Sequence, residues 1–106
     1  MPETDTPADV TLDGVLQALA DPVRLEMVRR LAAADHDVPC GSLYNDVAKS
    51  TASYHFALLR ASGLIEQYLN GNKKMNHLRV DEVEAALPGV LTSILASIVD
   101  PVAPDA

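Results

Sequence analysis

Hydrophobic residues recur with the spacing of an α-helix over the first third of the chain. Thr11 can cap a first helix, whose apolar face carries Leu12, Val15, Leu16 and Leu19. A second helix is predicted over residues 22–35, since Asp21 supplies a capping carboxylate and Pro22 suits the first helical position. Its apolar stripe is Leu25, Val28, Leu31 and Ala32, while Arg24, Glu26, Arg29 and Arg30 face largely outward. Residues 36–39 then form a polar link.

Two shorter helices joined by a tight turn are predicted next. The first covers about residues 42–48 and buries Leu43 and Val47. The second covers residues 51–62, follows a turn with an N-cap at Ser50, and has an inner face of Ala52, Phe56 and Leu59. Gly63 can end it in the left-handed conformation. Such a pair of helices indicates a helix-turn-helix.

The hydrophobic period then changes to that of β-strands. Residues 64–69 and 75–80 read as two strands, with a hairpin turn at residues 70–73. A helix capped by Asp81 follows, is interrupted at residues 88–89, and gives way to a last helix over residues 90–99. This order predicts a mainly α fold with a small β-hairpin, a winged helix-turn-helix over residues 11–99. Residues 1–10 and 100–106 are predicted to be a flexible arm and a flexible tail.

The charge distribution bears on the partner of this domain. A net charge of −7 opposes binding to nucleic acid, which depends on neutralising phosphates. Residues 49–79, however, hold five lysines and arginines against Glu66 alone, a local balance of +4. An acidic body with one basic segment can dock on DNA locally and repel it elsewhere. The alternative is that these bases only form a solvated face.

Several segments resemble one known family. They are ALADPVRL at residues 18–25, KSTASYHF at 49–56, LRASGLI at 59–65, NHLR at 76–79 and LPGVL at 87–91. Each motif is weak alone, but together and in this order they resemble the ArsR/SmtB-type repressors from about Leu12 to Val99. The resemblance implies a symmetric dimer that represses transcription and releases its operator when an inducer binds.

Residues that would contact double-stranded DNA lie on two segments. A helix entering the major groove leads with its N-terminal residues, so Thr51, Ser53, Tyr54 and His55 are expected to reach base edges. Lys49, Ser50 and Arg60 on the same segment suit phosphates. At the hairpin tip, Asn72, Lys73 and Lys74 can follow the backbone. A dimer would present two such helices to successive major grooves, which predicts an imperfect palindrome as operator.

Both terminal helices carry more apolar surface than one small core can cover. They are therefore predicted to form the interface of a homodimer through Leu12, Val15, Leu16, Leu19, Leu91, Ile94, Leu95 and Ile98. The alternative is that both helices pack only on their own domain.

Cys40 is the one residue able to sense oxidants through a thiol. It stands at the expected start of a helix, where the macrodipole favours a thiolate, although a buried structural thiol is the commoner case. The family's best-known metal sensors carry a Cys-x-Cys on the third helix or an Asp/His set on the last, and both are missing here. The one local cluster of possible ligands is Asp35, His36, Asp37 and Cys40, and it matches neither of these family patterns. We therefore expect neither a metal nor a cofactor.

Other functional classes find little support. No nucleophile–base pair, glycine-rich phosphate loop or carboxylate constellation stands out, which argues against an enzyme. No apolar run reaches the ~20 residues that a membrane span requires, and the acidic start is unlike a signal peptide, so we expect a cytoplasmic protein. The alternative to a DNA-binding repressor is a winged-helix adaptor that dimerises and binds proteins without DNA. The inducer stays open among a thiol oxidant, a metal, a small organic molecule and none.

Overall fold

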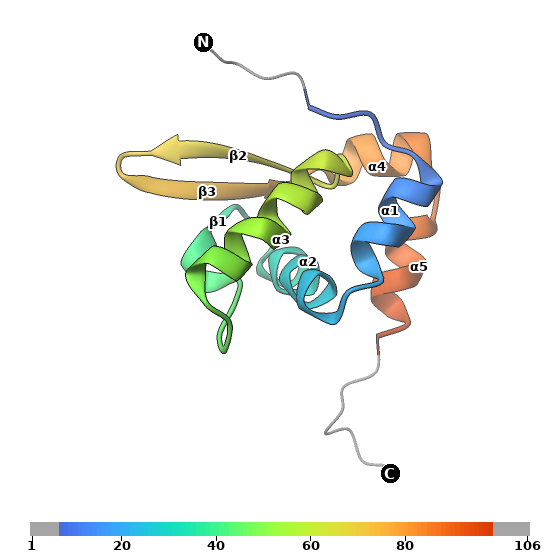
Figure 1. Ribbon diagram of the computed structural model, residues 1–106. Coiled ribbons are helices and arrows are strands. Elements are labelled where there is room, and N and C mark those ends of the chain that lie inside the picture. The colour runs from blue at the N-terminus through green and yellow to red at the C-terminus, as the bar shows by residue number, and fades with distance from the viewer. Residues whose placement is uncertain (1–6, 99–106) are drawn as a thin grey trace.

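The computed structural model describes residues 7–98. Helices and a small sheet follow one another in the order shown in Figure 1. The elements are α1 (Leu12–Leu19), α2 (Pro22–Ala34), β1 (Val38–Pro39), the 3₁₀ helix η1 (Cys40–Ser42), α3 (Lys49–Ala61), β2 (Ile65–Asn70), β3 (Lys73–Leu78), α4 (Val80–Ala86) and α5 (Val90–Ala96). The β2–β3 hairpin projects from one side, and α1, α4 and α5 lie at the opposite end of the molecule. The predicted winged helix-turn-helix is confirmed.

The first two helices begin as their capping residues predict. The Thr11 hydroxyl accepts a hydrogen bond from the Gly14 amide at 3.2 Å. The Asp21 carboxylate accepts from the Val23 and Arg24 amides at 2.8 and 3.2 Å. These bonds satisfy amide groups that have no partner inside the helix, so local sequence sets where α1 and α2 start.

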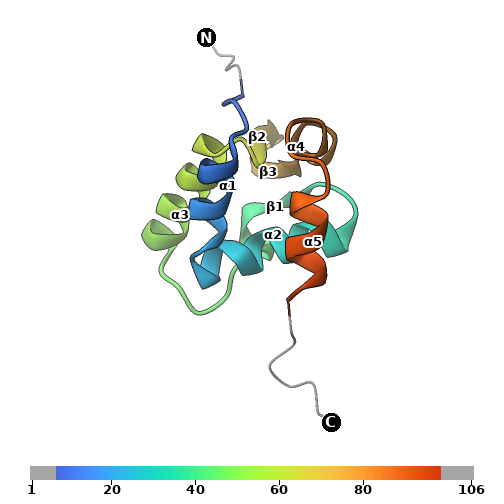
Figure 2. The same ribbon diagram turned by 90° about the vertical axis from the view of Figure 1, so that its right-hand side faces the viewer.

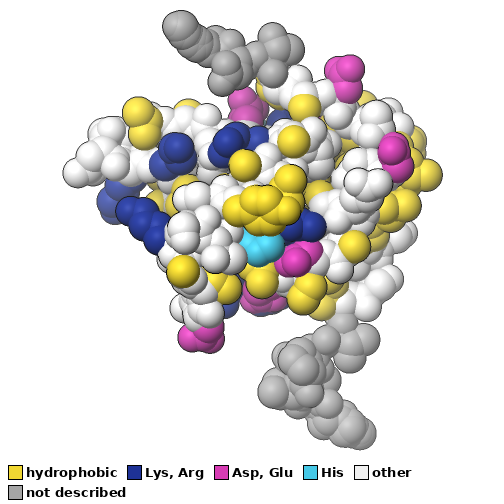
Figure 3. Space-filling model, viewed as in Figure 1, with side chains coloured by type: hydrophobic (Ala, Val, Ile, Leu, Met, Phe, Trp, Pro, Cys, Tyr) yellow, Lys and Arg dark blue, Asp and Glu magenta, His cyan; other side chains and the backbone are white. Residues whose placement is uncertain are grey.

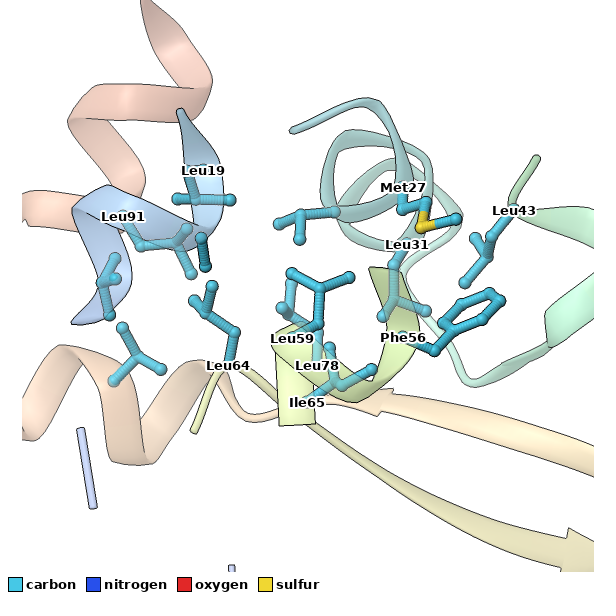
Figure 4. Packing of buried hydrophobic residues seen from close by; sticks show 14 of the residues in the cluster. Leu19, Met27, Leu31, Leu43, Phe56, Leu59, Leu64, Ile65, Leu78 and Leu91 are labelled. Carbon is cyan, nitrogen blue, oxygen red and sulfur yellow. The ribbon is translucent and has the colours of Figure 1, made fainter. Parts of the chain in front are cut away.

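One hydrophobic core joins the helices to the sheet. Figure 4 shows Met27 and Leu31 of α2 meeting Phe56 and Leu59 of α3 and residues of the hairpin strands. Leu64, Ile65 and Leu78 close this core from the side of the sheet, and all three are buried. α3 and the hairpin are therefore held in a fixed relation by shared packing.

The sheet contains a strand that the sequence pattern does not predict. Its order is β1-β3-β2, all antiparallel, and β1 pairs Val38 with Asn76 and Pro39 with Met75. The link at residues 36–39 was expected to be irregular because a two-residue strand has no readable period. A proline fits there because β1 lies at the edge, where one amide needs no ladder partner.

The hairpin turn is tighter than its predicted range of 70–73. Asn70 pairs with Lys73, so only Gly71 and Asn72 lie between the strands. Gly71 has a φ of 66°, a left-handed value that glycine adopts at little cost. Gly63 likewise has a φ of 82° just after α3, which confirms its predicted place at the end of that helix.

The predicted helix over residues 42–48 is wrong. A 3₁₀ helix covers only Cys40–Ser42, and the chain then runs irregularly to α3, although Leu43 is buried as predicted. The Val47 amide donates to the Asn45 carbonyl, a turn too tight for an α-helix. Short polar side chains such as those of Asn45 and Asp46 compete for backbone groups and disfavour helix interiors.

Three helix boundaries also differ from prediction. α3 begins at Lys49, with Ala48 at the N-cap and no side-chain cap, so Ser50 lies inside the helix. α4 begins at Val80, one residue before the predicted cap at Asp81. α5 ends at Ala96, and Val99 lies outside the described residues.

The chain ends are described in part. Residues 1–6 of the predicted arm and the predicted tail at 100–106 lie outside the described residues. Val10 packs against the core, and the Ala8 carbonyl accepts a hydrogen bond from Arg79 Nη1 at 3.2 Å. Within residues 7–98, no helix is long and apolar enough to cross a membrane.

Candidate nucleic-acid interface

A basic groove runs between α3 and the β2–β3 hairpin. Its volume is about 660 Å³, and its charged lining residues are Lys49, Arg60, Lys73 and Lys74. Every lysine of the chain is among them. Figure 3 shows Lys and Arg side chains gathering over this part of the molecule. The groove is thus a local positive surface on an acidic protein.

Arg79 does not belong to this surface. Its side chain is buried, and Nη1 donates to the Gly63 carbonyl at 2.6 Å. The guanidinium thereby satisfies the backbone where α3 ends and the sheet begins. Charge alone does not distinguish a buried arginine from an exposed one, so the basic segment defined from the sequence included Arg79.

The first turns of α3 present polar side chains to solvent. Ser50, Thr51, Ser53 and Tyr54 are exposed, and the Tyr54 side chain retains 61% of its accessible surface. The opposite face carries Ala52, Phe56 and Leu59, all buried. Exposed N-terminal residues on a helix beside a basic groove are the arrangement by which a recognition helix reads base edges.

His55 is not on the outward face, and the prediction that placed it there is wrong. Only 7% of the residue is exposed, and its Nδ1 lies 3.0 Å from Nη1 of Arg24. His55 follows Ala52 by three residues and precedes Leu59 by four, so the helical period puts it on the buried stripe. Its position was readable from this spacing. Its partner Arg24, predicted to face outward, is half-buried.

A chain of side-chain hydrogen bonds lies beneath the groove. Arg60 Nη1 donates to Gln67 Oε1 at 2.5 Å, and Gln67 Nε2 donates to Asn76 Oδ1 at 2.7 Å. The Cys40 Sγ accepts from Gln67 Nε2 at 3.4 Å and from Asn76 Nδ2 at 3.3 Å. Asn76 is fully buried and also donates to the Val38 carbonyl at 3.2 Å. These bonds tie α3, η1 and all three strands together.

Cys40 therefore has a different setting from the one predicted. It opens a 3₁₀ helix of three residues, too short to supply the macrodipole of an α-helix. Its thiol is half-buried and is hydrogen-bonded by two amide side chains. The sequence offered no signal for Gln67 and Asn76, because they meet Cys40 only through the order of the strands.

A polar cluster links the two strands of the hairpin to Asp37, the residue before β1. Asp37 accepts from Tyr68 Oη at 2.5 Å and contacts His77 Nδ1 at 2.9 Å. The hydrogen bond from Tyr68 lowers the pKa of Asp37, against the opposing effect of burial, and the bond to His77 lowers it further. The same contact raises the pKa of Tyr68. His77 thus has the structural role expected for it.

The predicted local cluster of Asp35, His36, Asp37 and Cys40 is not brought together. Asp37 engages Tyr68 and His77, whereas Cys40 contacts the amides of β2 and β3. Among residues 7–98, no group of three or more His, Cys, Asp or Glu side chains is arranged to hold a metal ion.

The proposed dimer residues fall into three groups. Val15, Leu19 and Leu91 are buried in the core of their own domain, so their assignment to an interface is wrong. Leu12 and Leu16 are 50% and 48% exposed on α1. Ile94 and Leu95 of α5, and Ile98 just after that helix, are half-buried. Figure 2 shows that α1 and α5 both face one end of the molecule.

Comparison with known proteins places this fold in a family. A model described as a helix-turn-helix domain matches residues 19–68. The uncharacterised HTH-type transcriptional regulator YceK of Bacillus subtilis (strain 168) is 34% identical over 82 residues, covering 76% of this chain and 82% of that protein. The crystal structure of an ArsR family transcriptional regulator is 26% identical with a TM-score of 0.62, covering 80% of this chain and 88% of that one. The chain belongs to the ArsR family of winged helix-turn-helix regulators.

A further solved structure shares the fold of this chain. HlyU from Vibrio cholerae N16961 is 25% identical with a TM-score of 0.62, covering 80% of this chain and 91% of that one. The resemblance read from the sequence motifs is therefore confirmed. This ArsR-family protein is a DNA-binding transcriptional regulator and not an enzyme.

Proposed function

We propose that this ArsR-family regulator is a homodimeric repressor that binds an imperfect palindromic operator. The observation that carries the proposal is the groove of about 660 Å³ in which the three lysines and Arg60 stand beside the exposed N-terminal residues of α3. Phosphate contacts position a protein on DNA, and side chains at base edges specify the sequence. In the complex, Ser53 and Tyr54 read bases with Thr51, while Lys49, Ser50, Arg60, Asn72, Lys73 and Lys74 hold phosphates. A repressor of this kind works in the cytoplasm.

Dimerisation is supported by the exposed part of α1. Leu12 and Leu16 lie one turn apart and are each about half exposed, and Ile94 and Leu95 of α5 and Ile98 just after it are half-buried. A two-fold interface would bury this same patch on both subunits. Two recognition helices would then meet successive major grooves, whose centres are roughly 34–36 Å apart.

The proposal is tested by selecting bound duplexes from a randomised DNA library with the wild-type protein. We expect enrichment of one imperfect palindrome whose half-sites lie about one helical turn apart. The enriched duplex, here termed the selected duplex, is compared with a scrambled duplex of equal composition by fluorescence anisotropy. A failure to enrich any sequence, with no salt-dependent binding to either duplex, would favour the adaptor alternative, which nothing among the relatives supports.

Cys40 is proposed as a thiol sensor that acts on this groove. Its sulfur shares Gln67 Nε2 with the hydrogen-bond chain that leads to Arg60. Peroxide would convert the thiol to a sulfenic acid and release water. The added oxygen would displace an amide donor and loosen Gln67, which in turn positions Arg60 beside the groove.

Substituting Cys40 with serine tests this sensor. The C40S variant should bind the selected duplex as tightly as wild type, but its binding should no longer fall on treatment with peroxide or diamide. Anisotropy before and after oxidation, with reversal by a reducing thiol, provides the measurement. Equal responses of wild type and variant would remove thiol sensing and leave a metal, a small molecule or no inducer.

A further inference from the structure

The guanidinium of Arg24 joins three helices that have separate roles in the proposed complex. From its place on α2, Nε donates to the Ala18 carbonyl at 2.7 Å, and Nη2 reaches the Gln17 carbonyl at 3.5 Å, both in the last turn of α1. Nη1 lies 3.0 Å from His55 Nδ1 on α3. The Arg24 side chain thus fixes the C-terminal end of α1, the helix that bears Leu12 and Leu16, relative to α3.

This contact determines the chemical state of His55. An arginine carries only donors and does not lose its proton in proteins, so Nδ1 of His55 must be the acceptor. The ring is therefore neutral, with its hydrogen on Nε2. A protonated His55 would put a second N–H against Nη1 and break the contact between α2 and α3.

His55 in turn supports the residue proposed to read bases. The rings of Tyr54 and His55 have centroids 5.5 Å apart and planes inclined by 60°. Tyr54 is exposed whereas His55 is buried, so a ring held by packing lies beside one that faces solvent. The orientation of the His55 ring consequently limits the positions open to Tyr54.

We propose that Arg24 is a positioning residue for sequence recognition, acting on Tyr54 through the neutral Nε2–H form of His55. The inference rests on the proposed reading of bases by Tyr54. Arg24 itself touches no base and adds no general attraction for DNA. Its loss should therefore reduce discrimination between sequences more than it reduces binding to DNA as such.

Asp21, at the start of α2, is a carboxylate that interacts with Arg24. Although burial raises the pKa of Asp21, backbone hydrogen bonds from Arg24 and Val23 lower it, and the net shift is downward. Asp21 therefore stays ionised near neutral pH and balances the charge of Arg24, while its carboxylate accepts hydrogen bonds from the backbone amides of Val23 and Arg24.

The first test compares R24Q with wild type on the selected and scrambled duplexes. We expect R24Q to lose about tenfold in affinity for the selected duplex, as the loss of one hydrogen bond to a charged donor implies, and much less for the scrambled one. The matched control is R29Q, which removes the same charge from an exposed position of α2 paired with Glu26. Equal losses of R24Q and R29Q on both duplexes would overturn the inference.

The second test separates positioning from folding. In H55N the amide oxygen can replace Nδ1 as acceptor, whereas H55L has no acceptor. At matched thermal stability, we expect the affinity ratio between the selected and the scrambled duplex to be larger for H55N than for H55L. Adding R24Q should lower this ratio in H55N but not in H55L. If the wild-type protein prefers the selected duplex but H55N and H55L have the same affinity ratio between the two duplexes, the inference fails while the proposed function stands.

The third test needs no DNA. Nuclear magnetic resonance that correlates the carbon-bound ring protons of histidine with its nitrogens distinguishes the two neutral tautomers. At neutral pH the wild-type protein should show His55 with an unprotonated Nδ1 and a protonated Nε2, and R24Q should lose this preference. A protonated Nδ1 in the wild-type protein would contradict the inference, even if every substitution weakened the fold.

Discussion

Replacing Leu12 and Leu16 with glutamate should yield a monomer and remove most operator binding. Each leucine is about half exposed on α1, and burying a leucine fully stabilises an assembly by about 1.5–3 kcal/mol. Four glutamates facing one another across a two-fold axis would replace that gain with repulsion. A monomer would bind only one half-site of the operator. Losing the contact with the second half-site reduces apparent affinity by roughly 10²-fold or more.

Sedimentation at micromolar concentration and anisotropy with the selected duplex measure these two effects. The control is V80E, which places one glutamate per subunit, half the charge that L12E/L16E adds, at an apolar residue of similar exposure on α4. Val15 and Leu19 are unsuitable for this purpose, because emptying their buried positions costs about 2–5 kcal/mol of folding stability. A monomeric wild type, or a dimeric L12E/L16E variant, would show that the subunits do not meet through α1.

Replacing Tyr54 with alanine should cost about 1–3 kcal/mol on the selected duplex, the value of one good base contact. Tyr54 is the most exposed aromatic side chain on α3 and stands in its first turns. Binding to the scrambled duplex should change little, because that binding depends on phosphates.

Tyr54→Phe provides the matched comparison, since it keeps the ring and removes only the hydroxyl. A loss in Tyr54→Phe as large as in Tyr54→Ala would assign recognition to the hydroxyl, and an intermediate loss would divide it between ring and hydroxyl. Unchanged affinity in Tyr54→Ala would mean that the bases are read elsewhere on the protein.

The helices and the hairpin were predictable because their signals are local. Thr11 and Asp21 begin helices by accepting hydrogen bonds from amides two or three residues further along the chain, and Gly63 ends one through its own backbone conformation. The hairpin turn is likewise contained within residues 70–73. The helix predicted over residues 42–48 is absent for a reason that is also local. Its apolar residues have helical spacing, but Asn45 and Asp46 stabilise turns, and packing of Leu43 alone does not require a helix.

The division between core and interface could not be read from the sequence. Periodicity shows which face of α1 is apolar, but Val15 and Leu19 belong to the core while Leu12 and Leu16 on the same stripe are exposed. The difference depends on how α1 packs against α2 and the other elements, and that is a tertiary property. Leu91 shows the same effect, since it is buried where its neighbours on α5 are only half-buried.

The polar contacts around the candidate site were hidden for another reason. Gln67 and Asn76 meet Cys40 only because β3 lies between β1 and β2, and Arg24 meets His55 across 31 positions of sequence. Spacing rules describe neighbours along one element and say nothing of these pairs. The helical period places His55 on the buried face of α3, but it does not indicate that Arg24 contacts it.

A salt series tests whether DNA binds in the groove between α3 and the hairpin. Wild-type affinity for both duplexes, measured by anisotropy between about 50 and 200 mM salt, should fall linearly on a log–log plot. In K73A/K74A both duplexes should bind more weakly, and the slope should flatten by about one unit for each phosphate that the variant no longer neutralises. R29A, which lowers the charge outside the groove, should retain the wild-type slope. Equal slopes for wild type and K73A/K74A would mean that DNA does not contact these lysines and lies elsewhere on the protein.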